Sequence, residues 1–342
     1  MSVRPAAVAA ALLSIGLAAC VSHVRYPPEG RFLKVYRAPA LEMFAYAPGT
    51  TDEVELHDAR RREHGYAIWR FSMPGSFETG QPGNRLTGTY YDSGLPGRKP
   101  LVIVLPVWGV SEYPSTMMTR AILRRSGGRM NVLRVDGRNR LMAWKDIEHS
   151  ATADEFISRV SNSAKRLKHA VIDVRRLIDW AQTRGEVDNG RIGLVGFSVS
   201  AVSGTLVMQS DSRVKSGALI MGGAMIGKIV SECPGNEQST REAVVRNLGF
   251  GVAEYERTVT ALFEGLDPID YPNRVNPGSI LITDAGKDDC IPGAARDAWW
   301  EALGRPERLS FNYDHRRSFL SMTPLGFNFL RRRIYEHLEE TL

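Results

Sequence analysis

The feature that most constrains the fold is a short apolar stretch that passes through two glycines and ends at a serine flanked by small residues. Residues 191–201 have the sequence RIGLVGFSVSA, and the apolar run before Ser198 predicts a buried β-strand. A helical pattern follows the serine directly. A strand, an abrupt turn and a helix in this order would present the Ser198 hydroxyl at the turn. The rest of the chain must therefore provide the sheet to which this strand belongs.

The turn carries the motif G-x-S-x-S at residues 196–200, with Ser200 at the place of the second glycine in the G-x-S-x-G motif of nucleophile elbows. Serine is still small enough for a tight turn. We predict that Ser198 is a nucleophile, and the alternative is a turn serine that only caps the following helix. Ser200 and Ser203 lie beyond the turn, where small size for helix–sheet packing explains them.

Length and composition are those of a folded globular protein. The 342 residues allow one large domain or two ordinary ones, and 43% of them are hydrophobic and 24% charged. The formal net charge of +6 arises from Lys and Arg scattered among acids, and Arg clusters such as 331–333 lack interleaved aromatic residues. These clusters predict a solvated surface rather than a nucleic-acid site, so no nucleic-acid partner is expected.

The N-terminus has the pattern of an exported lipoprotein. Arg4 precedes an apolar core at 6–17, which is short for a transmembrane helix and typical of a signal peptide spanning 1–19. The tetrapeptide Leu-Ala-Ala-Cys that ends at Cys20 resembles a bacterial lipobox, which implies cleavage and lipidation of Cys20. An ordinary signal peptide with a chance cysteine is the alternative. Val21, in place of an aspartate, favours the outer membrane of a Gram-negative bacterium, facing the periplasm.

Beyond the signal segment, residues 20–60 lack clean periodicity and are predicted to form a tether and an irregular lead-in, followed by one domain over 61–342. Two strand patterns that alternate polar and apolar residues predict an antiparallel hairpin, and further strands are apolar at nearly every position. The strand patterns lie at 66–73, 86–91, 99–106, 131–135, 191–195, 216–221, 279–283 and 308–313. Helical patterns fill the intervals, most clearly at 164–183. This order predicts the α/β class, with about eight strands in a mostly parallel sheet and helices on both faces.

One interval is too long for a plain crossover. Helical patterns near 241–248 and 252–264 predict a small helical cap, inserted over 227–271. The chain ends in an amphipathic helical pattern, in which His337 is predicted to lie at the surface.

From about residue 66 to the C-terminus the chain resembles the α/β-hydrolase family, whose nucleophile, acid and histidine follow one another in this order. The segment 280–292 is similar to the family's strand-Gly-x-x-Asp-x-x-Val-Pro segment, and placing Ala285 at the glycine selects Asp288 as the acid. Placing Gly286 there would select Asp289 instead, with the spacing to the proline one residue short, and Asp284 is a third candidate. A solvated turn would also explain the aspartates.

The resemblance implies that His315, which follows the last predicted strand, is the base that takes the proton from Ser198. The family usually has Gly-His at this place, whereas this chain has Asp314 before the histidine, and Asp314 could itself contact the ring. An exposed loop histidine is the alternative. The other histidines lie before the nucleophile or in the final helix, against the family's order.

Attack on a carbonyl group creates an oxyanion, which requires donors already directed at it. The resemblance implies that the backbone N–H of Val199 is one donor. The second should come from the loop after the strand at 99–106, where Pro106 stands in the place of a histidine that relatives often carry. This placement assigns the N–H of Trp108 to the oxyanion hole. The alternative is that Trp108 is a pocket wall and that Val107 donates.

Cys233 and Cys290 are the two cysteines that remain after removal of the signal segment. An exported protein can keep a disulfide, so these two either form one bridge or are two buried thiols. Motifs for metal sites, such as H-E-x-x-H or C-x-x-C, are missing from the sequence, as are phosphate-binding glycine loops. We therefore expect no metal and no cofactor.

These residues together predict a lipid-anchored serine hydrolase that cleaves a carboxylic ester of a small-molecule acyl substrate through an acyl-enzyme. The segment 267–271, DPIDY, resembles a linker in dienelactone-hydrolase-like and acyl-esterase relatives, which favours esters. A peptidase of the same fold is the second possibility. The third is a catalytically inactive surface lipoprotein that keeps the fold for binding, because Ser200 and the Asp-His pair depart from the family's pattern.

Overall fold

The computed structural model describes residues 23–29, 41–47, 53–77, 84–137, 141–326 and 328–342. The predicted signal segment and Cys20 lie outside the described residues. Among the described residues, no helix combines the length and the apolar character needed to cross a bilayer.

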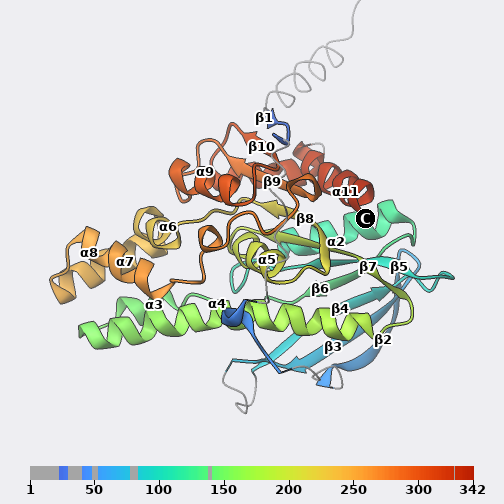
Figure 1. Ribbon diagram of the computed structural model, residues 1–342, viewed down its shortest axis with the longest axis horizontal. Helices are drawn as coiled ribbons and strands as arrows, with labels where there is room; N and C mark the ends of the chain where they lie inside the picture. Colours follow the sequence, from blue (N-terminus) through green and yellow to red (C-terminus); the bar gives the residue numbers. More distant parts are fainter. Residues whose placement is uncertain (1–22, 30–40, 48–52, 78–83, 138–140, 327) are drawn as a thin grey trace, which may run out of the picture.

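A single ten-stranded sheet forms the centre of the described fold, in the order β1-β10-β9-β8-β7-β5-β6-β4-β3-β2 (Figure 1). Its strands are β1 His23–Tyr26, β2 Glu55–Glu63, β3 Tyr66–Pro74, β4 Arg85–Asp92, β5 Lys99–Val104, β6 Asn131–Val135, β7 Val187–Phe197, β8 Val214–Ile220, β9 Ile280–Ala285 and β10 Glu307–Phe311. The six neighbouring strands from β10 to β6 run parallel, whereas β1, β4, β3 and β2 pair antiparallel. The mostly parallel α/β sheet and the opening hairpin β3–β4 are therefore as predicted.

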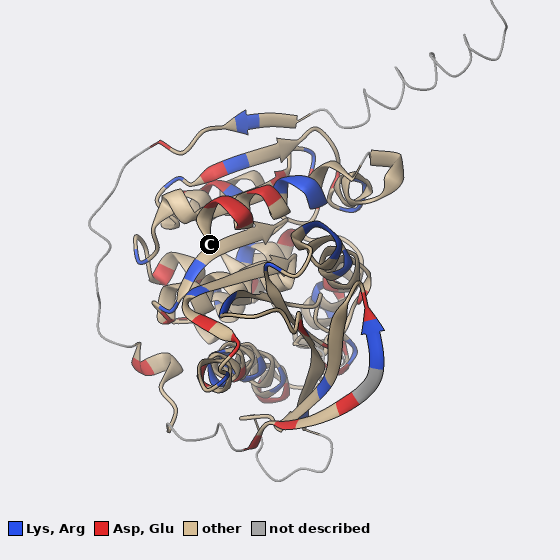
Figure 2. Ribbon diagram, turned by 90° about the vertical axis from the view of Figure 1, so that its right-hand side faces the viewer, with Lys and Arg blue, Asp and Glu red and all other residues tan. Residues whose placement is uncertain are grey.

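The sheet has two more strands than the sequence predicted, one at each edge. Both lie largely within the segment that we expected to be irregular, so that prediction is wrong for β1 and for most of β2. β1 has only four residues, and β2 has charged residues at most of its positions (Figure 2). Edge strands are commonly short or charged, because such features prevent pairing with other chains, and they consequently lack an apolar pattern.

Helices cover both faces of the sheet. The α-helices are α2 Tyr113–Ser126, α3 Trp144–Glu148, α4 Ala153–Gln182, α5 Val199–Ser210, α6 Ile226–Glu232, α7 Asn236–Leu248, α8 Val252–Leu262, α9 Gly293–Ala302, α10 His315–Ser318 and α11 Phe329–Thr341. Short 3₁₀ helices are η2 Glu42–Phe44, η4 Pro268–Asp270, η5 Pro277–Ser279, η6 Phe319–Met322 and η7 Pro324–Gly326.

Alternate residues of the central strands supply two hydrophobic cores. In β5, Leu101 and Ile103 join the core beneath α4, α5 and α9, whereas Val102 and Val104 join the core beneath α2 and α11. All four side chains are fully buried. A strand buried on both faces has apolar residues at every position, which is why the sequence pattern identified β5 directly.

The long helix α4 starts eleven residues earlier than the pattern at 164–183 suggested. Its start is fixed by Thr152, whose hydroxyl accepts a hydrogen bond from the amide of Glu155 at 3.2 Å. The added turns pack against the inserted helices, since the ring of Phe156 lies 5.8 Å from Phe250 and 5.5 Å from Tyr255. The periodicity of α4 was partly hidden because these turns contact the insertion and not the sheet.

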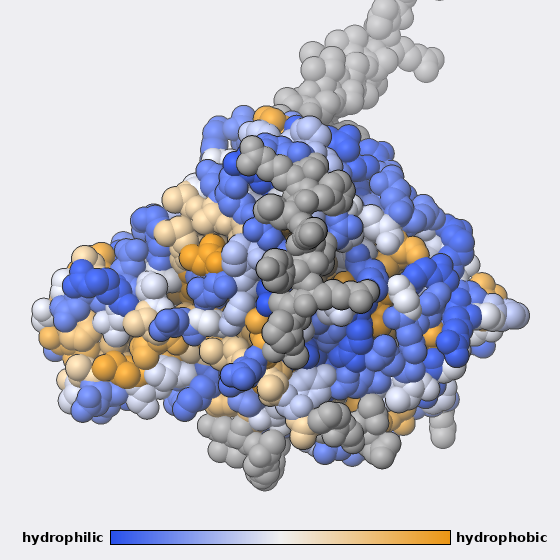
Figure 3. Space-filling model, viewed as in Figure 1, coloured by the Kyte–Doolittle hydropathy of each residue, from blue (hydrophilic) through white to orange (hydrophobic). Residues whose placement is uncertain are grey.

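The interval between β8 and β9 contains α6, α7 and α8, in agreement with the helical insertion expected over 227–271. These helices lie beside the first turns of α4 and the short helix α3, at one end of the molecule (Figure 1). On the face drawn in Figure 3, apolar residues are visible at this end. Val252, the first residue of α8, is 53% exposed.

The final helix α11 is amphipathic as predicted, but the prediction that His337 lies at the surface is wrong. His337 is 5% exposed, and its Nε2 lies 3.2 Å from the carbonyl oxygen of Ser279. Burial lowers the pKa of His337. The physical reason is that α11 packs against both β8 and α2, so the buried face of the helix is wider than its apolar stripe.

Candidate active site

The predicted nucleophile follows the central strand β7 in a strained turn. Ser198 has φ 54° and ψ −122°, a left-handed backbone that non-glycine residues rarely adopt. Its amide donates to the carbonyl of Ile220 at 2.7 Å, and its carbonyl accepts from the amide of Ala201 at 2.8 Å. The hydroxyl of Ser198 does not cap α5. This geometry argues against a capping role and leaves the half-buried hydroxyl available for chemistry.

The small residues around Ser198 have separate structural reasons. A Cβ atom at Gly196 would lie 2.3 Å from the carbonyl oxygen of Ser200, so the turn requires glycine at residue 196. Ser200 itself is fully buried; its hydroxyl accepts from the amide of Phe197 at 2.7 Å and donates to the carbonyl of Phe197 at 2.9 Å. The serine in place of the usual glycine is therefore accommodated and hydrogen-bonded. Ser203 is buried against the same turn.

Asp288 and His315 are brought together from the loops after β9 and β10. Nδ1 of His315 lies 2.8 Å from Oδ2 of Asp288. Because a carboxylate only accepts, Nδ1 donates and Nε2 of a neutral His315 is left as a proton acceptor. The other oxygen, Oδ1, accepts from the amides of Cys290 at 2.9 Å and Ile291 at 2.8 Å. Burial alone would raise the pKa of Asp288, but the hydrogen bonds from His315, Ile291 and Cys290 outweigh it, so the pKa is lowered.

The competing aspartates have other positions. Asp289 is exposed, whereas Asp284 is 1% exposed and pairs with Arg308 beneath the acid loop. Asp314 caps α10 by accepting from the amide of Arg317 at 2.8 Å. Of the acids that the sequence offered, Asp288 is the one that contacts His315.

The loops that carry these residues lie at one edge of the sheet. β5, β7, β9 and β10 belong to the parallel block, so the segments after their carboxyl ends share that edge. The ring of Phe319 lies 6.4 Å from Phe197 and 5.7 Å from His315, which connects the end of β7 to the histidine segment. No hydrogen bond joins Ser198 to His315 within the described residues. Such bonds are often long in free enzymes and shorten when substrate binds.

The predicted oxyanion donors lie in the loops after β5 and β7. Val199 is the first residue of α5, and its amide meets no backbone carbonyl among the described residues. In the loop after β5, the amide of Gly109 donates to Gly137 at 2.7 Å and Val107 pairs with Ser111. The amide of Trp108 has no backbone acceptor within the described ranges. Val107 takes part through its carbonyl, which accepts from the amides of Val110 at 2.9 Å and Ser111 at 3.2 Å. The amide of Val107 also has no backbone acceptor among the described residues, so both Trp108 and Val107 remain candidates for the second donor.

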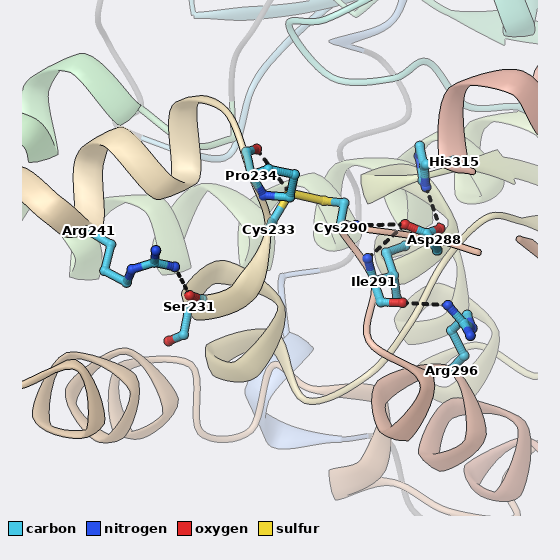
Figure 4. Close-up of a disulfide and its surroundings, with 9 residues drawn as sticks. All are labelled: Ser231, Cys233, Pro234, Arg241, Asp288, Cys290, Ile291, Arg296 and His315. Carbon is cyan, nitrogen blue, oxygen red and sulfur yellow. Dashed lines mark hydrogen bonds and ion pairs between the residues drawn. A yellow bond between two sulfur atoms is a disulfide. The ribbon is translucent and has the colours of Figure 1, made fainter. Parts of the chain in front are cut away.

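The two remaining cysteines form a disulfide, Cys233–Cys290, shown in Figure 4. Cys233 directly follows α6, and Cys290 lies in the acid loop two residues after Asp288. The bridge therefore links the helical insertion to the loop that carries the acid.

Asp267 and Gln209 are structural residues near the site that sequence reasoning did not assign. The carboxylate of Asp267 accepts hydrogen bonds from the amides of Met225 at 3.0 Å and Ile226 at 2.6 Å, at the start of α6. Nε2 of Gln209 in α5 donates to the carbonyls of Pro268 and Tyr271, each at 2.9 Å. The DPIDY segment thus holds the insertion against the sheet domain. An Asp-Pro pair at a helix start was the available signal for its capping role.

In the described part of the chain, no group of three or more His, Cys, Asp or Glu residues is arranged so that it could hold a metal ion.

No protein-family model matches the sequence, and a search of the curated proteins finds no relative. Solved structures with a similar fold do exist. An acetyl xylan esterase from Paenibacillus sp. R4 matches with a TM-score of 0.63 and 16% identity, over 84% of this chain and 89% of that one. Acetyl xylan esterase 1 from a Thermoanaerobacterium species matches with a TM-score of 0.56 and 15% identity, over 83% and 90%.

A third similar structure is the acylaminoacyl peptidase of Pyrococcus horikoshii, with a TM-score of 0.53 and 14% identity. It is matched over 81% of this chain but only 42% of the peptidase. At sequence identities this low, the similarity to these structures shows the fold alone. The order of the strands, the strained serine turn and these neighbours agree, and the chain has the α/β-hydrolase fold.

Proposed function

We propose that the protein is a serine hydrolase that cleaves carboxylic esters through an acyl-enzyme. The observation that carries this proposal is the 2.8 Å hydrogen bond between Asp288 and His315, at the sheet edge where Ser198 stands in a strained turn. An aliphatic hydroxyl needs an imidazole base oriented by a carboxylate to become an effective nucleophile. The proposal is supported by the positions of these three residues, which all follow strands of the parallel block of the sheet.

In the proposed reaction, Ser198 Oγ attacks the ester carbonyl while Nε2 of His315 takes its proton. Asp288 holds Nδ1 of the ring and stabilises the imidazolium that forms. The amides of Val199 and Trp108 donate to the oxyanion. The tetrahedral intermediate collapses when His315 gives the proton to the leaving alcohol. Water then attacks the acyl-enzyme by the same route and releases the acid and free Ser198.

An ester is the preferred substrate class for two reasons. The DPIDY segment resembles a linker of ester-cleaving relatives, and two of the similar solved structures are acetyl xylan esterases. A peptidase is the second candidate, supported by the acylaminoacyl peptidase, although more than half of that chain has no counterpart in the match. An inactive binding protein is the third, because no hydrogen bond yet joins Ser198 to His315 in the described structure.

A fluorophosphonate probe tests the proposal, because it labels only an activated serine. We expect labelling of the wild type, its loss in Ser198→Ala, and a drop of about 10⁴-fold in the labelling rate of Asp288→Asn. Ser203→Ala is the matched control, since this nearby serine is buried and should leave labelling intact. A folded wild type without labelling would instead support the binding protein. Short acyl p-nitrophenyl esters and short peptides then distinguish esterase from peptidase.

We further propose that Cys20 carries a lipid anchor that attaches the protein to the outer membrane, with the enzyme facing the periplasm. The support is the lipobox sequence, which ends three residues before β1. Expression in a Gram-negative host with a palmitate label should give a labelled protein in the outer-membrane fraction. Cys20→Ala should abolish the label, and an unlabelled wild type in the soluble periplasmic fraction would refute the anchor.

A further inference from the structure

The disulfide lies directly beside the proposed catalytic acid. Cys290 follows Asp288 by two residues, and its amide donates a 2.9 Å hydrogen bond to Oδ1 of that carboxylate (Figure 4). The Sγ of the same residue is bonded to Cys233. The opposite carboxylate oxygen receives the hydrogen bond from His315. One residue thus carries both a covalent link and an amide that fixes the orientation of the acid.

The second amide on Asp288 has support of its own. Ile291 donates to Oδ1 at 2.8 Å, and a Cβ atom at Gly223 would lie 2.7 Å from its side chain, which shows how closely the two residues pack. Arg296 also donates to the carbonyl of Ile291 at 2.7 Å. Cys290 is only half-buried and follows the exposed Asp289. The disulfide is a covalent contact that holds the Cys290 side of this turn.

The other end of the bridge is firmly placed. Helix α6 is capped at its start by Asp267, whose carboxylate accepts from the amide of Ile226 at 2.6 Å. Along its length α6 packs closely on α8, since a Cβ atom at Gly227 would lie 2.0 Å from the hydroxyl of Thr260. The amide of Cys233 closes the helix by donating to Ile229 at 2.9 Å. A fixed helix end is thus joined to a partly exposed loop.

We propose that Cys290, through its disulfide to Cys233, is a positioning residue for Asp288: the bridge holds the Cys290 amide on the carboxylate and so keeps Asp288 directed at His315. The kinetic consequence rests on the proposed function. Without the bridge, the hydrogen bond from the Cys290 amide to Oδ1 is lost and only that from Ile291 remains. The carboxylate of Asp288 can then rotate more freely, and it holds the His315 ring less firmly in position for proton transfer. Substrate binding does not depend on this orientation, so the loss belongs to the chemical step.

The test compares the double variant Cys233→Ser/Cys290→Ser with Thr260→Ala, which loosens the α6–α8 contact but leaves the bridge in place. We expect the double variant to lower kcat by about 10- to 100-fold with KM changed less than about twofold. The low-field proton NMR signal of the His315 Nδ1–H, identified by its loss in His315→Ala, should broaden or vanish. Thr260→Ala should keep both kcat and the signal.

A double-mutant cycle separates positioning from general damage. If the bridge acts through Asp288, its removal should change the labelling rate little in the Asp288→Asn background, whereas independent structural damage would add its full effect. A folded double variant that keeps kcat and the proton signal, or an additive cycle, would overturn the proposal.

The NMR readout does not require turnover. A wild type that hydrolyses no ester but loses its signal on removal of the bridge would disprove the proposed function and support this inference. A wild type without the signal would contradict the inference itself. If the double variant does not fold, reduction of the folded wild type with a phosphine, monitored by circular dichroism, provides the same comparison.

Discussion

At the scale of single residues, Ser200 shows that a departure from a motif can be a structural solution. Its hydroxyl satisfies both the amide and the carbonyl of Phe197, inside a fully buried turn. With glycine at residue 200, no side chain at that position would hydrogen-bond to the amide and the carbonyl of Phe197. Ser200 is therefore part of what stabilises the turn that displays Ser198.

The substitution Ser200→Gly should consequently destabilise the protein without improving activity. We expect a loss of about 1–2 kcal/mol in the free energy of unfolding, from the lost hydrogen bonds and from the larger backbone entropy that glycine loses when it enters a helix. Urea denaturation measures this loss, and the fluorophosphonate labelling rate should remain within about threefold of wild type. A large increase in labelling would show instead that Ser200 hinders the nucleophile.

Asp288 should give the protein a pH-dependent stabilisation. Burial opposes ionisation, but hydrogen bonds from His315, Ile291 and Cys290 hold the pKa of Asp288 below its ordinary value. A carboxyl with a lower pKa in the folded chain stabilises the fold above its unfolded pKa of about 4, and this contribution disappears as the pH falls through the folded pKa.

The difference in unfolding free energy between wild type and Asp288→Asn should therefore be largest near neutral pH and shrink below about pH 4. Urea denaturation at a series of pH values measures it. Asp289→Asn is the control, because it makes the same change of charge at the exposed neighbouring residue. If this difference in unfolding free energy stayed constant with pH, the lowered pKa of Asp288 in the folded chain would be contradicted.

At the scale of elements, the junction of β7 and α5 is a close contact between backbones. Gly196 lies where any Cβ atom would meet the carbonyl of Ser200 at 2.3 Å, and backbone atoms cannot move aside as a flexible side chain can. The angle between strand and helix, and with it the position of Ser198, depends on this contact.

Gly196→Ala should force the junction apart and lower the unfolding free energy by about 1–3 kcal/mol, the usual range for overpacking, or prevent folding. Gly185→Ala is the matched control, since a Cβ atom there meets nothing within 4 Å. Thermal denaturation of the two variants gives the comparison. Equal melting temperatures would show that the junction can relax.

At the scale of the whole molecule, β1 closes one edge of the sheet next to the strand that leads to His315. It pairs antiparallel with β10, and Arg25 forms a 2.8 Å ion pair with Glu307. The ring of His23 also lies 4.6 Å from Phe329 of α11. β1 thus covers the edge of β10 only a few residues after the proposed lipid anchor.

A chain that begins after Tyr26 should therefore expose the edge of β10, lower the melting temperature and aggregate more readily than a chain that begins at residue 21. Differential scanning fluorimetry and light scattering measure these effects. If both chains melt and scatter alike, β1 contributes nothing to the stability of the sheet.

The sequence by itself determined the class of the fold, the central strand, the serine turn and the helical insertion. These features depend on local chemistry: apolar runs indicate buried strands, and small residues around Ser198 indicate a tight turn. Tertiary structure decided the remainder. It placed the carboxylate of Asp288 against His315 and left Asp289 exposed, buried His337 and added the edge strands β1 and β2. It also joined Cys233 to Cys290 across the insertion. Each of these outcomes depends on which distant segments meet in space, and a local pattern does not contain that information.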